Sequence, residues 1–359
     1  MQKLLVFGLI YAYFLCKTRP HRSIAENWDE VFEIYKNEIN PGLENRGGHH
    51  FTRYDYMTEQ VLFYSNGTEI SGYLFVPIAK RKTQRPSLTF LGPFGFIKEQ
   101  SPIQYATRFA QFGYVTLIFD PRYYGESAGQ PRRWESKLRK IEDAKASIDF
   151  LTSLPEVDAD RVGVVGICQG ASEVLALAAQ DRRVGILALV GGQYIDRENL
   201  VRIVGGEEQY RKRLQRGDRA LRKYRESGKL EYLRVVDPEE KDVALPGRWQ
   251  WEWYHGWVPR SGWENYYAVL SDSDLMRWDA ETAISAVHCP TIMVHSDNAD
   301  SPSTARKFFN LLPSEQKMVE WLGAAQHYDF YDNPVIIDTA IHKIHKWLIQ
   351  LDGDNKGQY

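Results

Sequence analysis

Cysteine is scarce in this chain of 359 residues. Only Cys16, Cys168 and Cys289 occur, too few for a disulfide framework, and this favours a reducing compartment such as the cytoplasm. The chain also lacks an excess of charge of one sign, because its 45 basic residues are balanced by 47 acidic ones. Its net charge therefore gives no reason to expect binding to nucleic acid. Aromatic residues, by contrast, make up 13% of the chain, so an apolar pocket is easy to build. The expected partner is therefore a small molecule.

The chain has one long apolar run, near the N-terminus. Residues 4–16 are mainly apolar and lie between Lys3 and Lys17. As a helix this run would reach about 20 Å, short of the roughly 30 Å hydrocarbon core of a bilayer. It has the length of a signal-peptide core but lacks the small-x-small cleavage pattern. Two interpretations stay open: a helix docked on the protein, and a segment that targets or tethers the chain to a membrane.

The hydrophobic pattern predicts an α/β domain with one insertion. A hairpin over residues 59–64 and 69–76 is followed by short apolar strands at 87–91, 114–119, 162–166, 185–190, 291–295 and 317–321. Amphipathic helices at 103–112, 137–154, 171–180, 304–312 and 335–351 separate them, which predicts a mostly parallel sheet covered on both faces. We expect an extension over 1–50, a first core part over 51–195, an inserted helical lid over 196–285 and a second core part over 286–359.

Cys168 is the candidate nucleophile. It stands in the run Gly166-Ile167-Cys168-Gln169-Gly170, between an apolar strand and a helix, which is the nucleophile-elbow pattern with Cys in place of Ser. The glycines are needed because side chains two residues away would collide in so tight a turn. The alternative is a buried structural cysteine. A helix N-terminus and a nearby imidazole would both lower the pKa of the thiol, which favours the catalytic interpretation.

The expected partners of this nucleophile follow in the chain order nucleophile, acid, histidine. His327 comes after the last strand and is the expected general base. The loop after the preceding strand holds Asp297 and Asp300. Asp297, nearer the strand end, is the first choice for the orienting acid, and Asp300 is the alternate. The backbone N–H groups of Gln169 and Phe94 are the expected oxyanion-hole donors.

Three motifs resemble a known family. They are Gly92-Pro93-Phe94-Gly95 followed by Lys98-Glu99-Gln100, the run from Asp120 to Ser127, and Gly166-Ile167-Cys168. Together they resemble the dienelactone-hydrolase-like α/β-hydrolases, and most of all the fungal polyketide transferases and thiohydrolases. The resemblance implies the α/β-hydrolase fold. It also implies hydrolysis or transfer of acyl groups, often from thioesters in secondary metabolism, without a metal or organic cofactor.

The expected lid is rich in tryptophan. Five Trp fall between residues 249 and 263, and Trp249, Trp253 and Trp257 are candidates for walling an acyl-binding pocket. Packing of the lid on the core is the alternative, and the more ordinary use of such side chains.

One expected lid helix is strongly basic, with eight Lys and Arg between residues 211 and 225. Such a face could dock an acidic acyl-carrier protein, although a charge run is more often a solvated face. The pairs His49-His50 and His288-Cys289 lack metal-ligand spacing, so no metal is expected.

The motifs predict an acyl hydrolase or acyltransferase that works through a covalent acyl-enzyme on Cys168. The resemblance implies that its substrates are thioesters or related compounds of polyketide-type metabolism. A carboxylesterase or lactone hydrolase is the alternative among enzymes. A non-catalytic binding protein on the same fold is the alternative of another class, and the intact nucleophile, base and acid in chain order argue against it.

Overall fold

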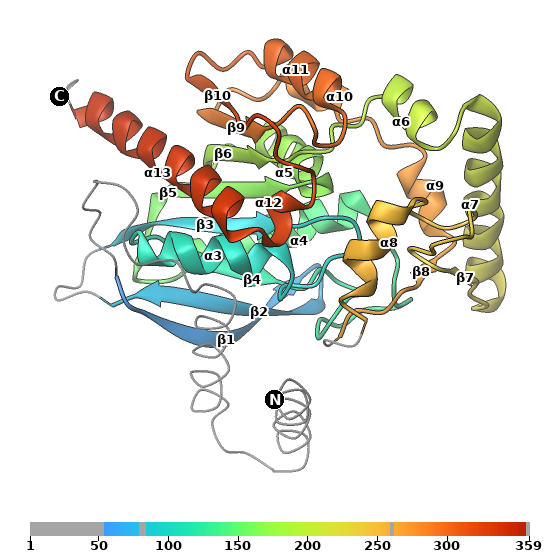
Figure 1. Cartoon of the computed structure of the whole chain (residues 1–359). Coiled ribbons are helices and arrows are strands. Elements are labelled where there is room, and N and C mark those ends of the chain that lie inside the picture. The colour runs from blue at the N-terminus through green and yellow to red at the C-terminus, as the bar shows by residue number, and fades with distance from the viewer. Residues whose placement is uncertain (1–53, 79–83, 259–261, 357–359) are drawn as a thin grey trace, which may run out of the picture. The chain divides into compact units, whose positions relative to one another are not determined.

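The computed structural model describes residues 54–78, 84–258 and 262–356. The expected N-terminal extension and its apolar segment lie outside these residues. At the centre is an eight-stranded sheet with the order β1-β2-β4-β3-β5-β6-β9-β10 (Figure 1). Its strands are β1 (Tyr56–Ser65), β2 (Thr68–Pro77), β3 (Arg85–Leu91), β4 (Val115–Phe119), β5 (Val157–Ile167), β6 (Val184–Val190), β9 (Thr291–His295) and β10 (Lys317–Trp321).

Strand direction changes at one side of the sheet. β1 and β2 form an antiparallel hairpin, and β2 is antiparallel to β4. From β4 to β10 every neighbouring pair is parallel. The central strands are buried on both faces, which explains why they appear in the sequence as continuous apolar runs.

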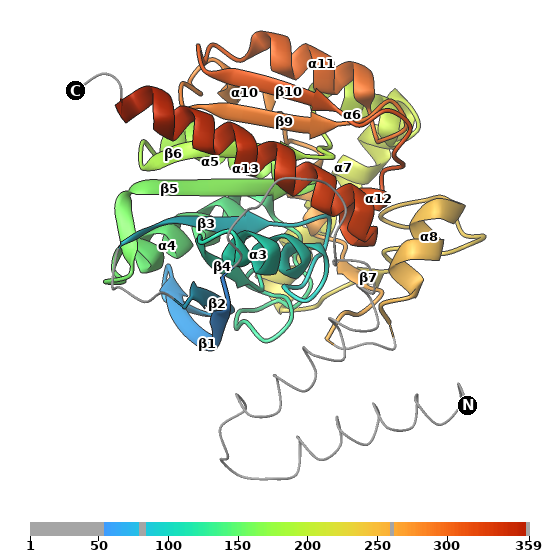
Figure 2. The same cartoon turned by 60° about the vertical axis from the view of Figure 1, so that its left-hand side comes forward.

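Helices cover both faces of the sheet (Figure 2). On one face α3 (Ser101–Gln111) packs against α13 (Pro334–Lys356), with α12 (Asp329–Asp332) beside them. On the other, α4 (Lys137–Thr152), α5 (Gln169–Gln180) and α10 (Glu281–Ile284) are successive neighbours, and α11 (Pro302–Leu311) lies next to α10. The expected strands and helices of the core therefore occur where the hydrophobic pattern places them.

The segment between β6 and β9 forms a separate structural layer at the C-terminal ends of the parallel strands. It contains α6 (Arg197–Ile203), α7 (Glu207–Ser227), β7 (Tyr232–Leu233), α8 (Arg248–His255), β8 (Tyr267–Ala268) and α9 (Ser271–Leu275), and ends with α10. Its apolar side chains, among them Tyr254 and Tyr267, pack with Phe94 and Tyr124 from the loops that follow β3 and β4. We call residues 197–275 the lid.

None of the helices in the described part of the chain combines the length and the apolar character needed to cross a bilayer.

Candidate active site

Cys168 lies at the turn from β5 to α5, in a backbone conformation with φ 56° and ψ −120°. A positive φ is unfavourable for a residue with a side chain, so the surroundings must enforce it. Gly166 and Gly170 make the turn possible. A Cβ at Gly166 would lie 2.5 Å from the Gly170 carbonyl oxygen, and a Cβ at Gly170 would lie 2.3 Å from that of Leu91. The thiol is thus presented at the N-terminus of α5, as the elbow pattern predicts.

His327 brings its imidazole to this thiol from the loop between β10 and α12. Its Nε2 atom lies 3.3 Å from the sulfur of Cys168. A second group reaches the same nitrogen, because the Tyr331 hydroxyl lies 2.9 Å from Nε2. Sequence reasoning missed Tyr331. The available signal was its spacing, since a tyrosine four residues after a histidine faces the same way when a helical turn follows.

The two aspartates of the loop after β9, Asp297 and Asp300, lie in different surroundings. The carboxylate of Asp297 is 59% exposed and accepts a hydrogen bond of 2.6 Å from Arg306. Asp300 lies at the imidazole instead, where its backbone N–H donates to Nδ1 of His327 at 3.2 Å. The Asp300 carboxylate accepts from the side-chain amide of Gln193 at 2.7 Å and from the Ser301 hydroxyl at 2.9 Å. The structure therefore does not bring Asp297, the first choice from the sequence, to the imidazole; it brings the alternate.

Burial controls the ionisation of Cys168 and His327. It raises the pKa of the Cys168 thiol to about 12, although hydrogen bonds from Tyr331 and from the Gln169 N–H act in the opposite direction. Burial also lowers the pKa of the His327 imidazole, against the charge of Asp300. Both shifts favour the neutral forms, so the resting pair is a thiol and an imidazole. The sequence-based expectation of a lowered thiol pKa is wrong, because burial outweighs the helix N-terminus.

The two expected oxyanion-hole donors lie on adjoining segments. Gln169 begins α5, and the next N–H, that of Gly170, donates to the carbonyl of Gly92 at 3.1 Å. This contact holds the loop after β3, which carries Phe94, against the start of α5. Phe94 is buried, and its carbonyl accepts a hydrogen bond of 3.1 Å from the hydroxyl of Tyr254 in the lid. Donation by these two N–H groups to a substrate oxygen stays a prediction.

A buried ionic cluster, which sequence reasoning missed, anchors the Gln169 side chain. Its amide donates to Glu135 at 2.6 Å and to Glu173 at 2.8 Å, and Glu135 also pairs with Lys140. Burial raises the pKa of Glu173 and lowers that of Lys137, whose charge also acts on the Cys168 thiol. Because Gln169 directly follows Cys168, this cluster fixes the position of the backbone at the elbow.

Of the three tryptophans expected at the site, Trp253 contacts Tyr328 and Tyr331, whose rings pack against His327. The Trp253 ring stacks on Tyr328 with centroids 5.6 Å apart and meets Tyr331 edge-on at 4.8 Å. Its indole N–H donates to Asp332 at 2.8 Å, which fastens α8 of the lid to α12. Trp257 is buried beside Trp253 at 5.9 Å, whereas Trp249 is 58% exposed.

The basic helix α7 is largely neutralised by neighbouring acids. Arg213 and Arg216 turn inward to the buried carboxylate of Asp272, at 2.7 and 2.6 Å. Arg211 and Lys212 pair with glutamates one turn earlier in the same helix. This arrangement is typical of a helix bound to its own domain, and docking of an acyl-carrier protein on it stays a prediction.

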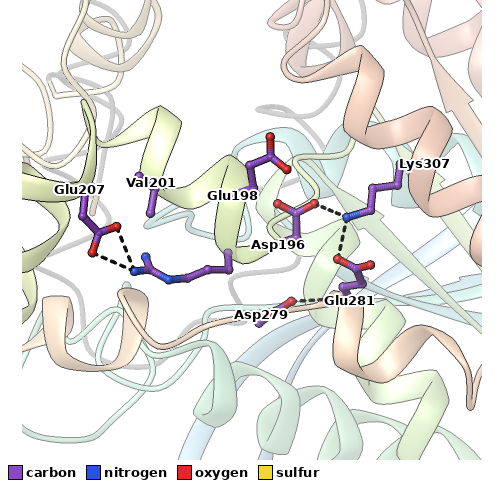
Figure 3. Close-up of a pocket in the computed structure, with 8 residues that line it drawn as sticks. Asp196, Glu198, Val201, Glu207, Asp279, Glu281 and Lys307 are labelled. Carbon is purple, nitrogen blue, oxygen red and sulfur yellow. Dashed lines mark hydrogen bonds and ion pairs between the residues drawn. The ribbon is translucent and has the colours of Figure 1, made fainter.

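An open pocket of about 470 Å³ lies apart from the catalytic pair, between the lid and α11 (Figure 3). Lys307 joins Asp196 at 2.8 Å and Glu281 at 2.7 Å across it. Its charged groups thus largely satisfy one another, and none belongs to the catalytic pair. The lining comprises Asp196, Arg197, Glu198, Val201, Glu207, Asp279, Glu281 and Lys307. Across the described residues, no three His, Cys, Asp or Glu side chains are arranged as metal ligands.

The sheet order, the elbow and the histidine in the loop after the last strand define an α/β-hydrolase. Comparison with known proteins agrees. Residues 94–198 match the model of the dienelactone hydrolase family. The uncharacterised protein YcjY of Escherichia coli is 30% identical over 278 residues, which span 74% of this chain and 89% of YcjY. The chain therefore belongs to the dienelactone hydrolase family, and it is an α/β-hydrolase enzyme.

Two further relatives add detail. A polyketide transferase of Penicillium crustosum is 31% identical over 126 residues, which are 35% of this chain and 41% of the transferase. The crystal structure of the hypothetical protein PA2218 of Pseudomonas aeruginosa superposes with a TM-score of 0.70 and 25% identity. That superposition covers 85% of this chain and 99% of PA2218.

Proposed function

We propose that the protein is a cysteine-dependent acyl hydrolase or acyltransferase that acts on thioesters, or related acyl compounds, of polyketide-type metabolism. The observation that carries this proposal is the 3.3 Å contact between the Cys168 sulfur, at the nucleophile elbow, and Nε2 of His327. The similarity to a protein named polyketide transferase supports the choice of substrate class.

Acylation begins when the thiol proton of Cys168 passes to Nε2 of His327. The sulfur then attacks the acyl carbonyl carbon and forms the C–S bond, while the carbonyl electrons move onto oxygen. The N–H groups of Gln169 and Phe94 are the proposed donors to that oxygen. When the tetrahedral intermediate collapses, the bond to the leaving thiolate breaks, and the leaving group takes the proton from Nε2.

Deacylation repeats these steps with an incoming hydroxyl group. Water or an acceptor alcohol gives its proton to Nε2 of His327 and attacks the acyl-enzyme. The Cys168 sulfur leaves and recovers the proton, so the enzyme returns to its neutral resting pair. Water yields hydrolysis and an alcohol yields acyl transfer.

Asp300 is the acid in this proposal. His327 can accept a proton at Nε2 only if its other proton is on Nδ1, which then needs a hydrogen-bond acceptor. In the resting structure Nδ1 instead receives the Asp300 N–H. In this state the proton of the neutral imidazole is on Nε2. We infer that, when substrate binds, this proton moves to Nδ1 and the Asp300 carboxylate turns from Gln193 and Ser301 to accept a hydrogen bond from it, since catalytic hydrogen bonds often tighten only in the substrate complex.

The test compares one acyl group presented as an N-acetylcysteamine thioester and as an ethyl ester. We expect kcat/KM to be at least about tenfold higher for the thioester, which corresponds to about 1.4 kcal/mol. A thiolate nucleophile expels a thiolate about as readily as itself, whereas an alkoxide is the poorer leaving group. Cys168→Ala should abolish turnover with the circular dichroism spectrum unchanged. The matched control is Cys289→Ala, which changes a cysteine packed against the core and should keep wild-type turnover.

Equal rates for the two substrates, or full activity in Cys168→Ala, would contradict the proposal. A lactone hydrolase is the second candidate, because the matching family is named for dienelactones. An enol lactone in the same panel distinguishes it: a kcat/KM above that of the thioester favours the lactone.

A further inference from the structure

Tyr331 makes contacts that packing alone does not explain. The residue is 1% exposed, so its hydroxyl needs partners within the protein. The hydroxyl lies 2.9 Å from Nε2 of His327, and the same nitrogen lies 3.3 Å from the sulfur of Cys168, so both reacting atoms are close to it. A tyrosine hydroxyl has one proton to donate and lone pairs to accept, so it can bridge both groups at once.

The helix that carries Tyr331 is held from two sides. On the lid side, Trp253 packs edge-on against the Tyr331 ring and donates its indole N–H to Asp332. On the core side, the Tyr105 hydroxyl of α3 donates to the Phe330 carbonyl at 2.8 Å. A buried hydroxyl held in this way costs little reorganisation when charge develops next to it.

We propose that Tyr331 is a catalytic residue of the acyl transfer described above: its hydroxyl donates a hydrogen bond to the Cys168 sulfur while the thiol proton passes to His327. Tyr331 keeps its own proton throughout, and forms no covalent bond. Once Nε2 is protonated, the same hydroxyl oxygen accepts from the Nε2 N–H. The inference rests on the proposed function only for the identity of the reaction, because the Tyr331 hydroxyl already lies at Nε2 of His327, next to the sulfur, in the resting enzyme.

The sulfur becomes charged in surroundings that offer it little other stabilisation. The titratable groups that face it are Tyr254 from the lid, Tyr328 and His327 from the loop before α12, Asp300, and Lys137 from α4. Burial opposes the thiolate most strongly and the Asp300 charge adds to that effect, whereas the Lys137 charge and the Gln169 N–H oppose it. In so dry a site, a hydrogen bond to a charged sulfur is stronger than one to the neutral thiol.

Tyr331→Phe tests the inference, with Tyr105→Phe as the matched control. Both variants remove one buried tyrosine hydroxyl that binds the same short segment, but only the first touches reacting atoms. For Tyr331→Phe we expect single-turnover acylation by an N-acetylcysteamine thioester to slow by about 10- to 100-fold, as loss of a hydrogen bond to a charged group predicts, with little change in KM. Iodoacetamide should also alkylate Cys168 more slowly at every pH from 6 to 10. Tyr105→Phe removes only a hydrogen bond that positions α12, so it should lower the melting temperature and slow both rates by less than about threefold.

Two results would overturn the inference. One is a Tyr331→Phe enzyme whose acylation and alkylation rates stay within about threefold of wild type. The other is an equal loss of rate in Tyr105→Phe, which would make the role of the tyrosine structural. If the wild-type enzyme forms no acyl-enzyme with any thioester, ester or lactone, the proposed function fails. The alkylation rates then still decide whether Tyr331 stabilises the Cys168 thiolate.

Discussion

The neutral resting state of the catalytic pair has a direct chemical consequence for Cys168. Iodoacetamide reacts with thiolates and not with thiols, so its rate measures the ionised fraction. Burial raises the pKa of this thiol to about 12 from a reference of 9.0. Because the folded pKa is raised, the thiol holds its proton at neutral pH, and the thiolate fraction grows tenfold with each unit of rising pH.

The size of the effect follows from these two values. At pH 7 a thiol with a pKa of 9 is ionised to about one part in 10², and one with a pKa of about 12 to about one part in 10⁵. Alkylation of Cys168 in the folded enzyme should therefore be about 10³-fold slower than in the unfolded chain, before any effect of limited access. The lowered pKa of His327 also slows alkylation, since a neutral imidazole does not stabilise the Cys168 thiolate.

The assay is alkylation by iodoacetamide from pH 6 to 10, with each cysteine peptide quantified by mass spectrometry. The same protein in urea supplies the unfolded reference. Cys289 is an internal comparison, because burial raises its pKa to about 11 at a site away from the catalytic pair. We expect the logarithm of the Cys168 rate to rise with unit slope through pH 10.

A rate for Cys168 that levels off below pH 8 would refute this reasoning. It would mean that the enzyme rests as a thiolate and an imidazolium, as the elbow motif alone suggests. Proton transfer would then precede substrate binding and would not depend on it.

Three further predictions concern the acid, the lid and the elbow. Asp300→Asn should lower kcat by about 10²- to 10⁴-fold, as loss of a triad acid does elsewhere. Asp297→Asn should keep kcat within a few-fold of wild type. A larger loss of kcat in Asp297→Asn than in Asp300→Asn would restore Asp297 as the acid. Trp253→Phe should raise KM and speed alkylation of Cys168, because the lid loses its hydrogen bond to α12, whereas Trp249→Phe should do neither. Gly170→Ala should lower the free energy of unfolding in urea by about 3 kcal/mol or more, since the added Cβ meets backbone atoms that cannot move aside; a loss below about 1 kcal/mol would contradict this.

The core of the fold could be predicted because its signals are local. Strands buried on both faces, such as β5, must be apolar throughout, and each lies next to a helix in the sequence. The elbow was equally accessible, because the glycines that its tight turn needs lie within two residues of Cys168. In both cases the sequence signal lies within a few residues, even where the contact behind it is distant, as between Gly170 and Leu91 of β3.

The contacts that set the thiol pKa and the geometry of the site could not be predicted from local sequence. Tyr331 comes 163 residues after Cys168, yet its hydroxyl reaches the same histidine nitrogen as the thiol. The cluster around Gln169 joins residues from the loop before α4, from α4 and from α5. The thiol pKa was misjudged for the same reason. The helix N-terminus is visible in the sequence, but the burial that outweighs it involves residues far along the chain, such as Tyr254 of the lid and Tyr331 of α12, which interact with the thiol.

The choice between the two aspartates shows most clearly where local reasoning ends. Distance from the end of β9 favours Asp297, if the chain turns away from the sheet at that point. It does not turn away there. The chain after β9 continues beside the chain after β10, with Asn298 paired in parallel with Gln326. Asp300 comes two residues after Asn298 and His327 one residue after Gln326, which brings the Asp300 N–H to the imidazole. The position of Asp300 beside the imidazole is therefore set by the pairing of two loops that lie far apart in the sequence, and no count from a strand end contains that information.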